Sequence, residues 1–302
     1  MKKIGIVLTD PKDWTADALM QEARKRGFET VSIDLGKLET SIGKDIEHLA
    51  GRINLSELDA IIIRDMGPGT SDAHVFSFDV LCELEESGII MVNSPAAIQN
   101  AANKFRASCL ISKTGINTPE TFVTQNVEPA LKKLESWEDA VIKPVFGYKG
   151  IDIKRIKDNK VIRPDGTPEK TTVYELISGS INEKGMLYIQ EFIENPGQDI
   201  RAFIVDGKVI GAIYRKAPEG WWLNNLSQGG TPQRCKLTKE QEEMCIGAAK
   251  AIGAVFAGVD IIEGDEKCFV LEVNATPSGA GIYKSLNINV AEYIIDAIKN
   301  RL

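Results

Sequence analysis

The chain contains near its C-terminus the stretch FAGVDIIEGDEKCFVLEVNATP, residues 256–277, in which a polar turn around Gly264 separates two apolar segments. This pattern predicts two strands joined by a hairpin, which brings Asp260 of the first strand alongside the second. Alternate residues of a strand point to the same face, so Glu272 and Asn274 project together. Three oxygen donors without His or Cys suit a hard cation such as Mg²⁺, although polar strand ends in solvent have the same pattern.

Two lysines occur where phosphate oxygens can be neutralised. Lys143 ends a short apolar strand and precedes a glycine-bounded turn at residues 146–152, whose backbone N–H groups can face an anion. Lys104 begins a predicted helix and, taken alone, is most simply a solvated lysine. The sequence contains neither G-x-x-x-x-G-K-[ST] nor G-x-G-x-x-G, so the fingerprints of P-loop and Rossmann dinucleotide sites are absent.

Charged residues also occur on two predicted strands upstream of this stretch. Asp199 and Arg201 are two residues apart and therefore share a strand face, and Arg215 ends the next strand. Asp206-Gly207 between the two strands is a strong hairpin signal. Arginines on adjacent strands near a cation site can clamp a transferring phosphoryl group, and an ordinary cross-strand ion pair is the alternative. The following Trp221-Trp222 pair is interpreted as packing residues.

Composition excludes several classes of protein. The 302 residues include 36 Lys+Arg and 43 Asp+Glu, a net charge of −7, and no basic stripe, so we expect no nucleic-acid partner. No apolar run approaches the roughly 18 residues that span a bilayer, and no signal peptide is recognisable, so we expect a cytoplasmic protein without a membrane partner. The 5 scattered cysteines and 2 distant histidines argue against a disulfide framework, a zinc site or a Ser-His-Asp triad.

Strand and helix signals divide the chain into three predicted units: residues 1–95, 96–186 and 187–302. In the first unit, strands alternate with helices, which indicates a mostly parallel sheet of the βαβ type. The third unit is rich in strands, and the fold class is therefore α/β together with α+β. The predicted strands are residues 3–8, 30–34, 60–64, 89–92, 141–144, 188–192, 200–205, 209–214, 256–262 and 268–274. The predicted helices are residues 16–26, 76–86, 104–113, 239–252 and 289–300, with a further helix starting at Ser94-Pro95.

The order of these features over essentially the whole chain resembles the ATP-grasp fold preceded by a Rossmann-like domain. Asp199-Ile200-Arg201-Ala202-Phe203, Asn225-Leu226, Gly229-Gly230 and residues 272–277 are similar to the RimK-type glutamate ligases. The motifs are specific as a set and weak singly. Two departures from the ribosomal-protein-modifying members, at residues 223–225 and 275–279, argue against a ribosomal-protein substrate.

The resemblance implies a role for each matching position. The residues that would bind ATP are the phosphate contacts Lys104 and Lys143, the flap residues Tyr148, Lys149 and Gly150, the adenine-binding hinge Gln190, Glu191, Phe192 and Ile193, and Asp199 at the nucleotide. Arg201, Arg215 and Asn225 would hold the phosphoryl group and the activated carboxylate. Asp260, Glu272 and Asn274 would bind Mg²⁺ or Mn²⁺, as a pair of ions.

The implied reaction is ATP-dependent ligation of L-glutamate to a carboxylate through an acyl phosphate, in a homo-oligomeric enzyme. Residues 64–68, 103–105 and 222–230 are most similar to archaeal ligases that act on small cofactors. Tetrahydromethanopterin is the preferred acceptor, and the methanogen deazaflavin coenzyme, a ribosomal or carrier-protein tail, or a non-catalytic ATP-binding role are the alternatives. Arg64 ends a strand of the first sheet, where it is a candidate contact of the acceptor or a structural salt bridge.

Overall fold

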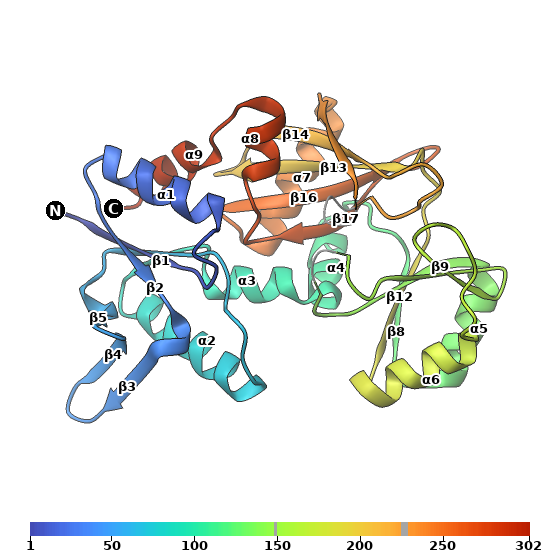
Figure 1. The fold of residues 1–302 in the computed structure, drawn as a ribbon, viewed down its shortest axis with the longest axis horizontal. Coiled ribbons are helices and arrows are strands. Elements are labelled where there is room, and N and C mark those ends of the chain that lie inside the picture. The colour runs from blue at the N-terminus through green and yellow to red at the C-terminus, as the bar shows by residue number, and fades with distance from the viewer. Residues whose placement is uncertain (148–149, 225–228) are drawn as a thin grey trace.

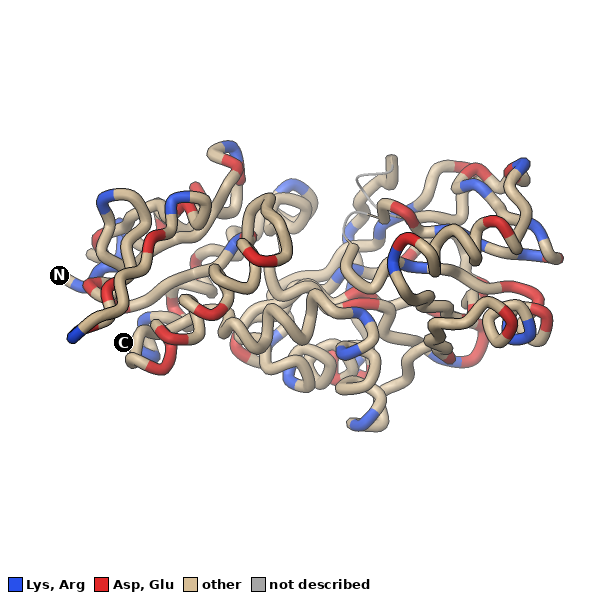
Figure 2. Tube along the Cα trace, turned by 90° about the horizontal axis from the view of Figure 1, so that it is seen from below, with Lys and Arg blue, Asp and Glu red and all other residues tan. Residues whose placement is uncertain are grey.

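The computed structural model of the chain describes residues 1–147, 150–224 and 229–302. Figures 1 and 2 show an elongated molecule whose two termini lie at the same end. Figure 2 shows Lys and Arg as well as Asp and Glu spread over the length of the molecule. Within the described ranges, no helix has both the length and the apolar character needed to cross a membrane.

The first sheet is parallel and has the strand order β2-β1-β6-β7. It consists of β1 (Lys3–Val7), β2 (Glu29–Ile33), β6 (Ala60–Ile63) and β7 (Ile90–Val92), which confirms the four strands predicted for the first unit. Helices α1 (Trp14–Lys25) and α2 (Ser71–Glu86) cover its two faces. Both helices begin earlier than predicted because Asp13 and Thr70 cap them, each accepting a hydrogen bond from a backbone N–H of the first turn.

A small antiparallel sheet, β3-β4-β5, lies in the connection from β2 to β6, where the sequence analysis predicted no element. Its strands are β3 (Leu38–Ile42), β4 (Ile46–Ala50) and β5 (Ile53–Asn54), flanked by the short 3₁₀ helices η1 (Leu35–Lys37) and η2 (Leu55–Glu57). Its strands are only two to five residues long and mix exposed with buried side chains, so they give little periodic signal.

The second sheet is antiparallel, with the order β11-β10-β9-β12-β8. Its strands are β8 (Thr121–Thr124), β9 (Asp139–Lys143), β10 (Lys154–Lys157), β11 (Lys160–Ile162) and β12 (Leu187–Glu191). Helices α5 (Val127–Trp137) and α6 (Val173–Lys184) pack on one face and enclose a separate core. In Figure 1 this unit forms the end of the molecule away from the termini.

The third sheet is also antiparallel, with the order β15-β14-β13-β16-β17. Its strands are β13 (Gln198–Val205), β14 (Lys208–Lys216), β15 (Thr231–Cys235), β16 (Phe256–Glu263) and β17 (Cys268–Asn274). Both predicted hairpins are confirmed. Asp206 and Gly207 form the turn between β13 and β14 with φ of 49° and 73°, values that favour this residue pair.

Two layers of helices cover the third sheet. One face packs on α3 (Pro95–Ala102), α4 (Lys104–Ser112) and α7 (Lys239–Ile252), and the other on α8 (Ala280–Leu286) and α9 (Val290–Lys299). Although α3 and α4 belong to the predicted unit 96–186, their buried residues join the core of the third sheet. Helix α9 packs beside α1, so one core extends from the first sheet to the third.

Asn93 follows β7 directly and connects the first sheet to the third from a fully buried position. Its Nδ2 donates to the carbonyl oxygens of Phe256 at 2.8 Å and Ala275 at 2.5 Å. Its Oδ1 accepts from the N–H groups of Val255 at 2.7 Å and Phe256 at 3.1 Å. These four bonds use every donor and acceptor site of the amide.

We predict that Asn93→Leu lowers the free energy of unfolding by about 3 kcal/mol, because buried backbone groups lose their partner while side-chain volume is kept. The midpoint of urea-induced unfolding measures the effect. Asn126→Ala is the control: Asn126 is exposed, makes no side-chain cap bond and should change stability by less than about 0.5 kcal/mol. Equal midpoints for Asn93→Leu and the parent chain would contradict the prediction.

Candidate active site

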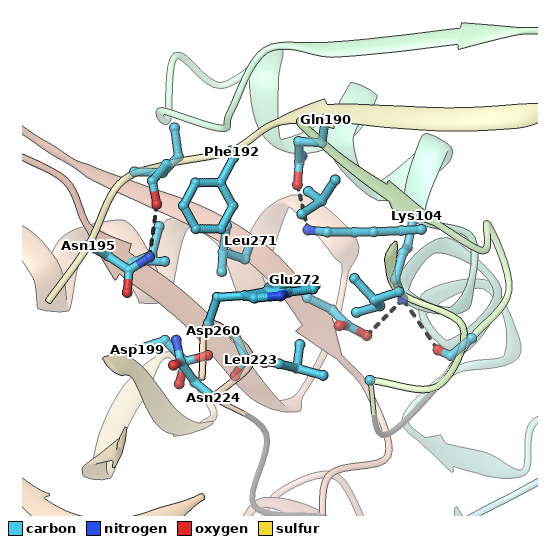
Figure 3. Close-up of a pocket in the computed structure, with 18 of the residues that line it drawn as sticks. Lys104, Gln190, Phe192, Asn195, Asp199, Leu223, Asn224, Asp260, Leu271 and Glu272 are labelled. Carbon is cyan, nitrogen blue, oxygen red and sulfur yellow. Dashed lines mark hydrogen bonds and ion pairs between the residues drawn. The ribbon is translucent and has the colours of Figure 1, made fainter. Parts of the chain in front are cut away.

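A pocket lies between the second and third sheets, and Figure 3 shows the side chains that line it. The predicted site residues among them are Lys104, Lys143, Gly150, Gln190, Glu191, Phe192, Ile193, Asp199, Arg215, Asp260 and Glu272. Gly147 and Ile151, which also line the pocket, belong to the predicted turn at residues 146–152. The sequence analysis missed other lining residues: Val141, Pro144, Ile153, Asn195, Leu223, Asn224, Ile262 and Leu271. Three predicted residues, Tyr148, Lys149 and Asn225, lie outside the described part of the chain.

Lys104 reaches the pocket from the first turn of α4 and is not a solvated lysine. Asn103 caps this helix by accepting from the N–H of Arg106, and the N–H of Lys104 donates to the carbonyl of Val145 at 3.0 Å. Lys104 is only 8% exposed. Its Nζ lies 3.2 Å from Glu272 Oε1 and 3.3 Å from the carbonyl oxygen of Gly147, as Figure 3 shows.

Lys143, at the end of β9, donates from Nζ to Gln190 Oε1 at 2.6 Å. Gln190 is buried on β12, and its Nε2 donates to Thr121 Oγ1 and to the Tyr188 hydroxyl, which fixes the amide with its oxygen toward the lysine. Burial and the nearby Lys104 lower the pKa of Lys143 to about 8, although carboxylates across the pocket oppose the shift. The ammonium is therefore charged at neutral pH and loses its proton in mildly alkaline solution.

Four charged side chains form a ladder across β14, β13 and β16, with signs that alternate in the order Asp199, Arg215, Asp260, Arg201. Arg215 donates from Nε to Asp199 Oδ1 at 2.7 Å and from Nη2 to Asp199 Oδ2 at 2.5 Å, and its Nη2 lies 2.8 Å from Asp260 Oδ2. Arg201 forms a second pair of bonds with Asp260, through Nε to Oδ1 and through Nη2 to Oδ2 at 2.7 Å. The ladder holds two carboxylates and two guanidinium groups against each other at the pocket floor.

Burial and neighbouring charges act in opposite directions on the ladder. Burial favours the neutral acid at both aspartates. At Asp199 it outweighs the effect of Arg215, and the pKa of this carboxyl is raised. At Asp260 the two arginines outweigh burial, and the pKa is held below its usual value. Burial lowers the pKa of Arg215, but Asp260 and Asp199 outweigh it, so that the pKa is raised and Arg215 keeps its charge.

Gly258 leaves the space that Arg201 needs to reach Asp260. A Cβ atom at Gly258 would lie 3.0 Å from Arg201 Nη1 and 3.0 Å from the Cβ of Pro277. A side chain there would press on both groups, so glycine lets the guanidinium cross the strand without displacing its neighbours.

The predicted metal ligands lie on one face of the β16–β17 pair. Asp260 is opposite Glu272 and Gly258 is opposite Asn274 in the strand register, as the hairpin prediction requires. Among residues 1–147, 150–224 and 229–302, no cluster of three or more His, Cys, Asp or Glu side chains suited to a metal is found. The predicted set has only two such side chains, because Asn274 is an amide.

The oxygen donors of this set differ in how free they are. Both oxygens of Asp260 already accept from guanidinium groups, whereas Glu272 is one-third exposed and, among the described residues, forms an ion pair only with Lys104. Asn274 Oδ1 accepts from the N–H of Thr276 at 2.8 Å. The donors are all oxygen atoms, which fits a hard cation, with Glu272 as the most available ligand.

The hinge residues leave β12 along the apolar part of the pocket. The N–H groups of Glu191 and Phe192 donate to the carbonyls of Glu120 and Asp139, and the Ile193 carbonyl accepts from Asn195 Nδ2 at 2.9 Å. The pocket is also lined by the apolar side chains Val141, Ile153, Leu223, Ile262 and Leu271. The pocket thus has an apolar part at Phe192 and Leu271 and a charged part at Lys104 and the ladder, and Lys143 lies against the hinge residue Gln190.

Leu271 lines the pocket next to Glu272, although strict alternation would place these neighbours on opposite faces. The register of β16 and β17 shifts between Asp260 and Ile261, so that Leu271 is an extra residue in the ladder of strand pairs. A β-bulge of this kind can turn two successive side chains to one face. No sequence signal marks it.

The loop after β14 supplies Trp222, Leu223 and Asn224 to the pocket. Trp222, interpreted as a packing residue, packs edge to face on Phe192 and also lines the pocket. Asn224 is buried, and its Oδ1 has no hydrogen-bond partner among the described residues. An unpaired buried oxygen at a pocket wall favours a ligand that donates a hydrogen bond there.

Arg64, the candidate acceptor contact, is 6% exposed and is bonded within the chain. It donates from Nε to Asp13 Oδ2 at 3.0 Å and from Nη1 to the carbonyl of Pro277 at 2.9 Å, and burial lowers its pKa. These contacts match the structural alternative, a bridge between the first sheet and the segment after β17. Its role in acceptor binding stays a prediction.

Comparison with known sequences supports a single family. Residues 1–98 match the RimK PreATP-grasp domain and residues 101–298 match the RimK-like ATP-grasp domain. The chain is 50% identical to the Methanosarcina acetivorans tetrahydromethanopterin:alpha-L-glutamate ligase, with 100% of each chain covered. It is 33% identical to the Methanococcus maripaludis protein of the same name, with 99% of this chain and 98% of that one covered.

Solved structures with low sequence identity share the fold. The ATP-grasp ligase PsnB complexed with minimal precursor has a TM-score of 0.74 at 21% identity, covering 100% of this chain and 99% of that one. D-cycloserine synthetase DcsG has a TM-score of 0.72 at 16% identity, with 99% of both chains covered. These neighbours confirm the predicted ATP-grasp fold with a preceding α/β domain. Taken with the domain matches along nearly the whole sequence, they show that the chain belongs to the RimK-like ATP-grasp family.

Proposed function

We propose that the protein is an ATP-dependent ligase that joins L-glutamate to a carboxylate of tetrahydromethanopterin. The observation that carries the proposal is the 50% identity, over the full length of both chains, to the Methanosarcina acetivorans protein with that name. Two further archaeal relatives with the same name, at 33% identity, also cover nearly the whole chain.

The pocket has the chemistry that such a ligase needs. A carboxylate is a poor electrophile, and phosphoryl transfer from ATP converts it to an acyl phosphate. The α-amino group of glutamate then attacks the acyl carbon, forms the amide and expels phosphate. No enzyme nucleophile is required, so the contribution of the protein is positioning, charge stabilisation and exclusion of water.

The pocket has parts that suit the base and the phosphates of ATP. Its apolar part at Phe192 suits the base, and Lys104 and Lys143 are the proposed contacts of the phosphates. Arg215 and Arg201 are held by aspartates before any ligand arrives, so they need no reorganisation when charge develops on the transferring group. Asn225 is the third proposed contact of that group.

A divalent cation, Mg²⁺ or Mn²⁺, fits beside Glu272, with Asp260 and Asn274 as the further proposed ligands. When bound, it would neutralise phosphate oxygens and polarise the phosphorus toward attack. The PsnB ligase, a neighbour at 22% identity with a TM-score of 0.73, has a solved structure that contains Mg and ADP. We propose two ions, a homo-oligomeric assembly and a cytoplasmic location without nucleic-acid or membrane partners, as the sequence analysis expected.

The product assay tests the acceptor. The protein is incubated with ATP, Mg²⁺ and L-glutamate and, in turn, with tetrahydromethanopterin, the deazaflavin coenzyme and a ribosomal or carrier-protein tail. We expect tetrahydromethanopterin to gain the mass of one glutamyl residue, with release of ADP that depends on both acceptor and glutamate. Modification of the deazaflavin or of a protein tail alone would refute the proposed acceptor, and nucleotide binding without any product would refute the ligase.

We predict that Glu272→Gln abolishes turnover, because it removes the most available anionic ligand of the cation without removing volume. ADP binding measured without metal should stay within about threefold of the parent value, because the proposed phosphate lysines remain. Glu266→Gln, on the exposed turn between β16 and β17, is the matched control and should be fully active. Full activity of Glu272→Gln would exclude this residue as a required metal ligand.

Nucleotide binding should weaken in alkaline solution. The ammonium of Lys143 has a pKa of about 8, so it is charged below that pH and neutral above it. If only the charged form binds phosphate, the dissociation constant of ADP rises by about tenfold per pH unit above the pKa. Lys143→Arg, which stays charged, should flatten the profile. Calorimetric titrations with ADP between pH 7 and pH 10 measure the dissociation constant for the unmodified chain and for Lys143→Arg. A dissociation constant that does not change with pH in the unmodified chain would disprove the role of Lys143.

A further inference from the structure

Arg155 lies on β10, outside the pocket, and covers the face of the Phe192 ring. Its guanidinium carbon is 3.5 Å from the ring centroid, and the residue is 9% exposed. A cation over an aromatic face is attracted by the ring quadrupole, and the attraction is stronger when the pair is shielded from water. Phe192 itself lines the pocket, near Leu271 and Asn195 in Figure 3.

Asp139, the first residue of β9, fixes both members of this stack. Arg155 donates to it in a bidentate arrangement, from Nε to Oδ1 at 2.8 Å and from Nη2 to Oδ2 at 2.6 Å. The carbonyl of Asp139 accepts from the N–H of Phe192 at 3.2 Å. Asp139 therefore fixes the Arg155 guanidinium through its carboxylate and the backbone of Phe192 through its carbonyl.

Trp222 lies on another side of the Phe192 ring. The two rings meet edge to face, with centroids 6.3 Å apart and an interplanar angle of 82°. Trp222 donates from Nε1 to the carbonyl of Arg163 at 2.6 Å and from its backbone N–H to the carbonyl of Pro164 at 3.1 Å. The stack of Arg155, Phe192 and Trp222 thus ties the second sheet, the hinge and the loop after β14 into one wall of the pocket.

We propose that Arg155 is a positioning residue for nucleotide binding, which acts by holding the Phe192 ring at the apolar part of the pocket. The proposal rests on the proposed function for the identity of the ligand, an adenine nucleotide. The base is the apolar, planar part of that ligand and suits the apolar part of the pocket at Phe192. Arg155 does not itself line the pocket, so its effect must pass through the ring.

Arg155→Met tests the proposal because it keeps the length of the side chain and removes the charge and the fork. We expect the dissociation constant of ADP and the KM for ATP to rise by about threefold to thirtyfold, with kcat at saturating ATP unchanged. Lys157→Met is the matched control. Lys157 lies on the same strand and also pairs with Asp139, at 3.6 Å, but it is exposed, and neither constant should change.

A double-mutant cycle separates this role from a general structural one. In a Phe192→Leu background, which has no ring to hold, Arg155→Met should weaken ADP binding much less than in the parent chain. Arg155→Lys keeps a positive charge beside Asp139, so this variant should fold even if Arg155→Met does not. It should weaken ADP binding by less than Arg155→Met. Thermal unfolding without nucleotide shows whether each variant is folded.

An unchanged ADP dissociation constant in both Arg155 variants, equal effects in the two backgrounds, or a loss of kcat at constant KM would each overturn the proposal. ADP binding needs no acceptor, so a chain that binds ADP and forms no product refutes the ligase function and leaves this test valid. A parent chain that binds no adenine nucleotide would overturn both.

Discussion

The alternating ladder of Asp199, Arg215, Asp260 and Arg201 is the constraint on which the pocket depends. Three of these groups are almost completely buried, and removing one partner of a buried ion pair costs about 3–5 kcal/mol. Asp199 is paired with Arg215, and Arg201 with Asp260, directly across neighbouring strands. A slip of one residue would turn these charges into the apolar core on the other face, so the ladder and the strand register determine each other.

The same face of β13 serves two purposes along its length. Asp199 lines the pocket and Arg201 pairs with Asp260 of the pocket wall, whereas Phe203 and Val205 enter the core shared with the first sheet. Strand β13 thus connects the pocket floor to the core in which α1, near the N-terminus, packs on α9, near the C-terminus. Asn93 reinforces this connection, because its four bonds attach the end of β7 to the start of β16 and to the segment after β17.

The charged residues and the apolar residues of the pocket are held in position in different ways. The lysines and arginines are placed by strand ends, a helix start and cross-strand ion pairs, so their positions are set before a ligand binds. The hinge, in contrast, is a single segment that leaves β12. Its Phe192 ring is held from outside the pocket by Arg155 on β10. Fixed donors in a shielded site interact more strongly with developing charge than mobile donors in water.

The sequence by itself determined the elements with local signals. The Asp206-Gly207 turn, the polar turn after β16, and the alternation around Glu272 and Asn274 are consequences of neighbouring residues, and the structure confirms the two hairpins that they predict. The order of the motifs along the chain, which include charged residues, glycine turns and the hinge at residues 190–193, was also sufficient to identify the family.

The tertiary structure alone decided which of these residues meet, because contacts between distant segments leave no periodic signal. It placed α3 and α4 on the third sheet, turned Leu271 to the pocket through a bulge, and engaged Arg64 with Asp13 and Pro277. It also put Arg155 on Phe192, a pair that no spacing in the sequence connects. Each of these contacts depends on how elements that are distant in the sequence pack side by side. Burial and charge pairing across the whole fold set that packing, and local propensity does not.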